Sequence, residues 1–163
     1  DLLRDRVAIE MKRHFKKDFK RIGHATKVAR YAEQIVREER GDPAVVLAAA
    51  YLRDIGAAER PAQGPADGNG RHPSGEVLAG EILDRLGARS EMVEEVRHII
   101  GEIEAGAVES LNSRIVHDAD WIASAEERLK AQPEARDAVM AEIEVRLLTE
   151  AGGRVAGAVL AGE

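Results

Sequence analysis

The stretch Ala-Ala-Ala-Tyr-Leu-Arg-Asp-Ile-Gly at residues 48–56 decides how this 163-residue chain folds. It completes an apolar segment that opens at Asp42-Pro43, a capping carboxylate followed by proline at the first helical position. The segment from Ala44 to Asp54 is apolar on almost every face until Arg53, which predicts a buried central helix. Asp54 ends that helix, and its carboxylate must reach the surface or meet a partner, because an unpaired buried charge is costly.

The sequence on both sides of this segment predicts further helices and no strand. Besides 44–54, we expect helices over residues 2–15, 18–40, 74–86, 90–104, 109–125 and 133–149, with a short apolar tail after Gly152-Gly153. Glycines and prolines interrupt the helical pattern between residues 56 and 75, which predicts a long loop over 57–73. The fold class is therefore all-α: one domain over 1–163 with about six to eight helices, its core at about 18–125 and its C-terminal helices at 133–162.

Composition narrows the classes of function. The chain has no cysteine, which excludes disulfides and thiolate sites and suits a reducing cytoplasm. It has a net charge of -6 and only five aromatic residues, so we expect no nucleic-acid partner. No run of eighteen apolar residues occurs, and the charged start lacks the apolar core of a signal peptide. We therefore expect a cytoplasmic protein without a membrane partner.

Three polar positions outside the central helix are candidates for chemistry. His24 lies in the predicted helix 18–40, where a lone histidine is more often structural than a metal ligand. Asp118 and Asp120 flank Ala119 beside Trp121. On a helix, residues two positions apart point about 200° away from each other, so both carboxylates cannot face one ion. We expect one of them to face a site and the other to point outward or to support it.

Five segments together resemble the HD superfamily of metal-dependent phosphohydrolases. They are Asp-Phe-Lys-Arg-Ile-Gly-His-Ala-Thr-Lys-Val (18–28), the stretch 48–56, Gly-Glu-Val-Leu-Ala-Gly-Glu-Ile-Leu (75–83), Val-Arg-His-Ile-Ile (96–100) and Ile-Val-His-Asp-Ala-Asp-Trp-Ile (115–122). Each segment is a weak signal alone, whereas the ordered set with matching separations is a strong one. The resemblance runs from Asp18 to Trp121 and implies a helical HD fold.

The resemblance also implies a metal site. In that family a histidine on the second helix, an adjacent His-Asp pair and a distant aspartate hold one or two divalent ions. These positions correspond to His24, Arg53-Asp54 and Asp120, so His24, Asp54 and Asp120 are the implied ligands of manganese, iron, cobalt, zinc or magnesium. Such an ion lowers the pKa of bound water and polarises a phosphoryl oxygen. The family role of the adjacent aspartate makes Asp54 the candidate catalytic base.

The chain departs from the family pattern at several positions. Arg53 replaces a metal-binding histidine, and arginine does not bind metals because it stays protonated. Ile103-Glu104 occupies the place of a histidine pair found in many relatives, so that only Glu104 could bind an ion there. Before the fourth helix, His72 lies one position out of register with a further histidine of relatives. Arg21, Arg53 and His72 are the candidate residues for binding a substrate phosphate.

Three roles stay open for Arg53. Its guanidinium could bridge Asp54 or Asp120 in place of the ion, which arginine does well through paired hydrogen bonds. It could instead face a substrate phosphate beside a surviving mononuclear metal site, or lie on the surface at a helix end.

The corresponding functions differ in class. The first is a metal-dependent phosphohydrolase acting on nucleotides or small phosphate esters. The second is a catalytically inactive HD-like module, without a metal cofactor, that binds a small phosphorylated molecule or a protein partner. The third is a structural domain whose alanine-rich tail at residues 154–160 packs on a partner or on a second copy, which leaves a homodimer open; packing of the tail on its own domain is the preferred alternative.

Overall fold

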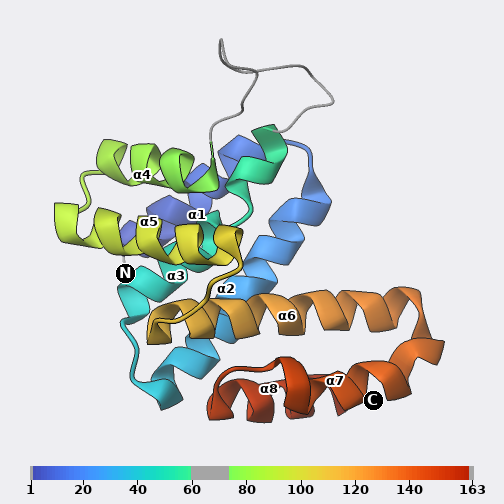
Figure 1. Ribbon diagram of the computed structural model, residues 1–163. Helices are drawn as coiled ribbons and strands as arrows, with labels where there is room; N and C mark the ends of the chain where they lie inside the picture. Colours follow the sequence, from blue (N-terminus) through green and yellow to red (C-terminus); the bar gives the residue numbers. More distant parts are fainter. Residues whose placement is uncertain (1, 60–73, 162–163) are drawn as a thin grey trace.

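The computed structural model describes residues 2–59 and 74–161, and within these ranges it is built from helices alone (Figure 1). The helices are α1 (Leu2–Phe15), α2 (Phe19–Glu39), α3 (Pro43–Leu52), the 3-10 helix η1 (Ile55–Glu59), α4 (Gly75–Arg85), α5 (Ser90–Ala105), α6 (Leu111–Ala131), the 3-10 helix η2 (Pro133–Ala135), α7 (Arg136–Arg146) and α8 (Glu150–Ala161). The expected all-α class is thus confirmed. None of the described helices is both long enough and apolar enough to cross a membrane.

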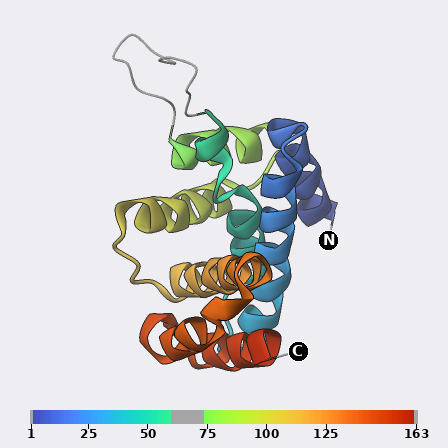
Figure 2. The same cartoon turned by 90° about the vertical axis from the view of Figure 1, so that its right-hand side faces the viewer.

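Helix α3 is the centre of the fold. Its residues Val45 to Ala50 and Leu52 are buried, as the apolar stretch predicts. It contacts α1, α2, α5 and α6, and to a smaller extent α4, so five helices surround it (Figures 1 and 2). The Asp42 side chain accepts hydrogen bonds from the backbone N–H groups of Ala44 and Val45 and fixes where the helix begins. Because α3 is held on all sides, the residues that follow it at its C-terminal end are placed firmly.

Helices α2 and α6 form the most extensive helix pair and lie against one another across the middle of the molecule. Asp18 caps α2 by accepting a hydrogen bond from the Arg21 backbone N–H at 3.2 Å, and Ser110 caps α6 through the Ser113 N–H. Figure 2 shows α4 at one end of the molecule, α7 and α8 at the other, and α6 beside α7 and α8. The end of α3 meets the facing sides of α2 and α6, where the candidate side chains lie.

The C-terminal boundaries correct the sequence prediction. Helix α6 continues to Ala131, and the helix after Pro133 ends at Arg146, before the expected end at residue 149. Gly152 and Gly153 were expected to separate the helix before them from a short apolar tail, but both lie inside α8. A Cβ at Gly152 would overlap the Asp118 carboxylate, so this glycine permits close packing instead of breaking a helix.

The predicted loop is shorter at its start than expected. Residues 57–59 belong to the 3-10 helix η1, whereas residues 60–73 lie outside the described residues. At the junction between η1 and α4, a Cβ at Gly56 would lie 2.6 Å from the Gly75 backbone nitrogen. The two segments therefore approach each other too closely for a side chain, which closes the fold beside the end of α3.

Candidate functional site

Three candidate side chains from three helical segments converge. His24 comes from α2, Asp54 follows α3, and Asp120 comes from α6, with donor atoms that all lie within 4.8 Å of one another. The His24 Nε2 atom lies 2.8 Å from Asp120 Oδ1 and 3.8 Å from Asp54 Oδ2. In the part of the chain that the structure describes, these residues form the single group of three donors close enough to hold a metal ion. By number, spacing and chemical type, the donors fit a divalent ion.

The second ring nitrogen of His24 contacts Glu127, a residue that the sequence analysis did not identify as a candidate. This Nδ1 atom lies 2.9 Å and 3.1 Å from the two carboxylate oxygens of Glu127, and Lys27 Nζ lies 3.6 Å from the same group. Glu127 follows Asp120 by seven residues, so the two lie on one face of α6, two turns apart. The imidazole is thus held between two carboxylates of one helix. That seven-residue spacing is the signal that could have identified Glu127.

These contacts change the proton affinity of the histidine. The hydrogen bond with Asp120 raises the pKa of His24 from 6.5 to about 9, against the opposing effect of burial and with further support from Glu127. Burial raises the pKa of Asp120, but the hydrogen bond from His24 and the charge of Arg53 outweigh it and bring that pKa below its ordinary value. At neutral pH the pair is therefore an imidazolium that donates to a carboxylate.

Arg53 lies against both carboxylates of the group. Its Nη1 donates a hydrogen bond to Asp54 Oδ1, and its Nη2 lies 3.4 Å from Asp120 Oδ2. The Arg53 side chain is only 26% exposed, so it does not extend into solvent as a surface residue would. Its buried Nε–H has no hydrogen-bond partner among the described residues. Of the three roles expected for Arg53, the bridging of carboxylates is the one that these contacts match.

Asp118 points away from this group. It is fully buried and accepts hydrogen bonds from the backbone N–H groups of Leu148 and Thr149, each at 2.9 Å, and from Thr149 Oγ1 at 2.7 Å. His117 Nδ1 lies 2.9 Å from the same carboxylate. Asp118 thus fixes the start of α8 against α6, while Asp120 faces the site. This division between the two aspartates agrees with the expectation from their spacing.

The remaining candidates have structural contacts of their own. Arg21 Nη1 lies 2.9 Å from Asp18 Oδ2, so its guanidinium is paired with the residue that caps α2. Glu104 accepts a hydrogen bond from the Gly75 N–H at 3.0 Å, and a Cβ at Gly75 would lie 2.7 Å from the same carboxylate. His72 lies outside the described residues. Of the two predicted phosphate-binding residues that the structure describes, Arg21 and Arg53, Arg53 is the one that contacts the donor group, through Asp54 and Asp120.

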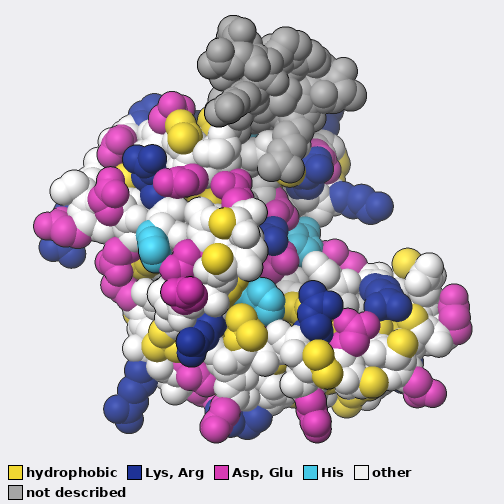
Figure 3. Space-filling model, in the orientation of Figure 1, with side chains coloured by type: hydrophobic (Ala, Val, Ile, Leu, Met, Phe, Trp, Pro, Cys, Tyr) yellow, Lys and Arg dark blue, Asp and Glu magenta, His cyan; other side chains and the backbone are white. Residues whose placement is uncertain are grey.

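Two hollows flank Asp54. The larger, of about 750 Å³, is lined by Asp18, Phe19, Lys20, Arg21, Gly23, His24, Lys27, Asp54, Glu127 and Ala131. The smaller, of about 280 Å³, is lined by Arg53, Asp54, Ala57, Ile103 and Glu104. Figure 3 shows histidine, acidic and basic side chains together where the surface is hollowed above α6. We call the larger hollow the ligand cleft.

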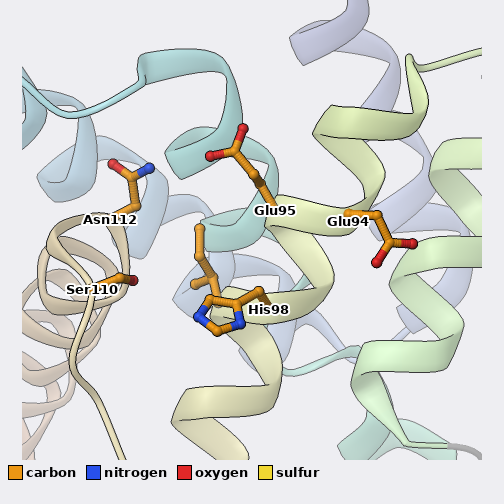
Figure 4. A pocket seen from close by; sticks show the side chains of 6 residues that line it. Glu94, Glu95, His98, Ser110 and Asn112 are labelled. Atoms are coloured by element: carbon orange, nitrogen blue, oxygen red, sulfur yellow. The ribbon is translucent and has the colours of Figure 1, made fainter.

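Another hollow, of about 340 Å³, lies between α5 and the start of α6 and is separate from this group (Figure 4). His98 lies on its lining, but its Nε2 is 2.5 Å from Glu102 Oε2 on the same helix. The Asn112 side-chain oxygen accepts a hydrogen bond from the Asp42 N–H at 3.1 Å. These polar groups tie helices and helix ends together, so this hollow is a weaker candidate site than the ligand cleft.

The helical bundle and the cluster of one histidine and two aspartates from separate segments define a class of protein, the helical domains built around a candidate metal site. The chain belongs to the HD domain family, whose sequence model matches residues 21–125. This confirms the resemblance to the HD family.

Solved structures agree with the fold. The chain is similar to Bacillus subtilis YpgQ in its selenomethionine crystal structure, with a TM-score of 0.69, 18% identity, and coverage of 97% of this chain and 86% of that one. It is equally similar to the crystal structure of Bacillus subtilis YpgQ in complex with ADP, with a TM-score of 0.70, 18% identity and coverage of 97% and 87%. No curated protein matches the chain. At this identity the likeness establishes the fold.

Proposed function

We propose that this HD domain is a catalytically inactive module that binds a small phosphorylated molecule. One observation carries the proposal: the Arg53 guanidinium contacts both Asp54 and Asp120, the two carboxylates that would otherwise face a metal ion. Arginine supplies positive charge and hydrogen-bond donors, which suit the binding of a phosphate. It cannot lower the pKa of a water molecule or polarise a phosphoryl oxygen as a bound ion does.

Binding of an ion to the three donors would require a rearrangement. The guanidinium of Arg53 would have to leave Asp54 and Asp120, because an ion and an arginine cannot share the same carboxylate oxygens without strong repulsion. His24 would also have to release the proton on Nε2, where it now meets Asp120. The free-energy cost of these two changes opposes metal uptake and favours the present arrangement, in which Arg53 contacts Asp54 and Asp120.

The ligand cleft supports the binding of a phosphorylated molecule. Its volume of about 750 Å³ lies within the range of about 300–1,000 Å³ that is common for small-molecule sites. Lys20, Arg21 and Lys27 line it and give it positive charge for phosphate oxygens, although Arg21 and Lys27 also pair with Asp18 and Glu127. Bacillus subtilis YpgQ has been crystallised in complex with ADP, which makes ADP a reasonable first probe for this chain.

A second function, a metal-dependent phosphohydrolase, is favoured by a different observation. The Nδ1 of His24 faces Glu127, and histidines that bind a metal commonly donate their other N–H to a carboxylate in this way. Here His24, Asp54 and Asp120 would hold the ion, and Asp54 would also orient and deprotonate the attacking water. When bound, the ion would activate that water. Arg53 would leave the carboxylates and contact the phosphate.

One set of measurements separates the two functions. We would purify the protein without chelators or a histidine tag and measure its metal content by elemental analysis. We would then record thermal unfolding with ADP and with inorganic phosphate, and assay phosphate-ester hydrolysis with added manganese, iron and cobalt. The inactive module predicts no stoichiometric metal, stabilisation by ADP and no hydrolysis.

Variants at one position sharpen this test. Arg53 does not line the ligand cleft, but its partner Asp54 does, so Arg53→Met leaves an uncompensated carboxylate there and should weaken stabilisation by ADP. The matched change Arg128→Met on the exposed side of α6 should leave that stabilisation intact. Arg53→His restores the family residue and should increase metal uptake. About one metal equivalent in the unaltered protein together with hydrolysis would establish the phosphohydrolase instead. A protein that neither responds to ADP nor hydrolyses esters would refute both functions.

A further inference from the structure

The turn between α1 and α2 concentrates positive charge on a chain that is negative overall. Residues 12–21, which we call the basic turn, contain six basic residues and one acidic residue, although the whole chain carries a net charge of -6. The rest of the chain therefore has a net charge of -11. Lys12, Arg13, Lys16, Lys17 and Lys20 are all exposed. A local field of this kind attracts an anionic partner to one restricted part of the surface.

The lysines of the basic turn are not used to hold the fold together. Lys12, Lys16, Lys17 and Lys20 form no ion pair with any residue of the described ranges, whereas Arg13 pairs with Glu10 at 2.9 Å. Lys16 has a φ of 57°, a left-handed conformation that ends α1 and lets Lys16 and Lys17 follow one another in the turn. Four ammonium groups are thus free to meet an external anion.

Apolar side chains lie among these charges. Phe19 is 73% exposed at the first position of α2, although Phe15, one turn earlier in sequence, is buried in the core. Ile9 is 49% exposed on α1, where positions three and four residues later hold Lys12 and Arg13 on the same face. A surface that combines exposed lysines with a protruding aromatic ring is typical of proteins that bind the interface of an anionic bilayer.

We propose that the basic turn is a docking surface for a membrane containing anionic lipids, with lysines contacting headgroups and Phe19 entering the interface. The absence of a spanning segment, on which the expectation of no membrane partner rested, does not bear on peripheral contact of this kind. A nucleic acid fits less well, because an extended polyanion would run from the turn onto the negatively charged remainder of the surface. A bilayer can instead contact the basic turn without contacting the negatively charged remainder of the surface.

The surface is separable from the ligand cleft by mutation. Asp18, Phe19, Lys20 and Arg21 belong to the basic turn and also line the cleft, whereas Lys16 and Lys17 do not line it. The double variant Lys16→Gln/Lys17→Gln therefore tests docking without touching the proposed phosphate site. The control double variant Lys130→Gln/Arg146→Gln removes the same charge from exposed positions on α6 and α7.

The experiment is sedimentation of the full chain with vesicles of phosphatidylcholine, alone or mixed with phosphatidylserine. We expect binding to the mixed vesicles only, weakening as salt is added. Each lysine near an anionic surface contributes about fivefold in binding, so Lys16→Gln/Lys17→Gln should weaken it about 30-fold. Phe19→Ser should weaken it about tenfold, and the control variant should bind like the unaltered protein.

Several outcomes would overturn the docking surface. They are absence of binding to the mixed vesicles, equal binding to neutral vesicles, an unchanged affinity in Lys16→Gln/Lys17→Gln, or equal loss in the control variant. Tighter binding to duplex DNA than to the mixed vesicles would assign the turn to nucleic acid instead. Stabilisation by ADP, measured on the same double variant, reports separately on the proposed function, so that failure of one does not imply failure of the other.

Discussion

Raising the pH should remove a stabilising charge from the centre of the site. In the folded protein the pKa of His24 is about 9, against an ordinary value of 6.5, mainly because its Nε2 donates to Asp120. Since the folded-state pKa is the higher one, the stability from this group is fully present below pH 6.5 and is lost as the pH rises through 9.

The size of this effect follows from the pKa difference. Between 6.5 and about 9 it corresponds to about 3 kcal/mol in the free energy of unfolding. The His24 and Asp120 side chains are only 15% and 19% exposed, so solvent screens their contact weakly, whereas the contact with the more exposed Glu127 is screened more and contributes less. For a domain of this size, a loss of about 3 kcal/mol is a large part of a typical total stability of about 5–15 kcal/mol.

The measurement is urea unfolding at the two ends of this pH range, for the unaltered protein and for His24→Gln. The unaltered protein should lose the stated stability, whereas His24→Gln should be less stable at the lower pH and nearly independent of pH across the range. Titration of the His24 ring by NMR supplies the pKa directly, and Glu127→Gln should lower it. Equal pH dependence in both proteins, or a midpoint near 6.5, would show that the imidazolium is not held between two carboxylates.

Three further predictions concern stability, each measurable by urea unfolding. Arg53→Met leaves two half-buried carboxylates without their guanidinium and should cost about 1–2 kcal/mol, partial exposure reducing the cost of a fully buried pair; an unchanged stability would contradict the bridge. Asp118→Ala should cost about 3 kcal/mol and speed hydrogen exchange at the start of α8, because Asp118 accepts hydrogen bonds from the Leu148 and Thr149 amides just before that helix; unaltered exchange would contradict that anchor. Gly152→Ala should lower the free energy of unfolding by about 1–3 kcal/mol, because the added Cβ would overlap Asp118. Gly153→Ala should raise it by up to about 1 kcal/mol, because a Cβ there has no atom within 4 Å; the reverse order would contradict the packing of Gly152 on Asp118.

Much of the fold could be predicted because its determinants are local in sequence. The apolar run before Arg53 identifies the central helix, and Asp18 and Asp42 mark two helix starts through capping bonds to residues two or three positions away. The end of the chain could not be predicted in the same way. Gly152-Gly153 indicates a break by its own propensity, whereas α8 includes both glycines and Gly152 packs closely on Asp118, a contact more than thirty residues away in sequence.

The candidate site likewise contains residues that the sequence predicts and residues whose role depends on contacts distant in sequence. His24, Asp54 and Asp120 could be grouped from the family resemblance, and the structure brings their donor atoms together. Glu127 was not predicted, because its role depends on its contact with Nδ1 of His24, which lies 103 residues away in sequence. Spacing showed that Asp118 and Asp120 must diverge, but it could not tell which one faces the site. That choice follows from the packing of Leu148 and Thr149 against α6.

The contacts of Arg53 explain how the rest of the site can persist without the family's histidine. Asp54 and Asp120 come close enough to repel each other when both are charged, so a cation beside them stabilises the ionised pair. An ion would provide that cation in a hydrolase, and Arg53 provides it here from within the chain. One substitution therefore has two opposite effects: it satisfies the carboxylates electrostatically, and it takes away a metal ligand. Because the carboxylates remain satisfied, no further change at Asp54 or Asp120 is required for folding, and the cleft beside them keeps its shape and its charged lining for a ligand.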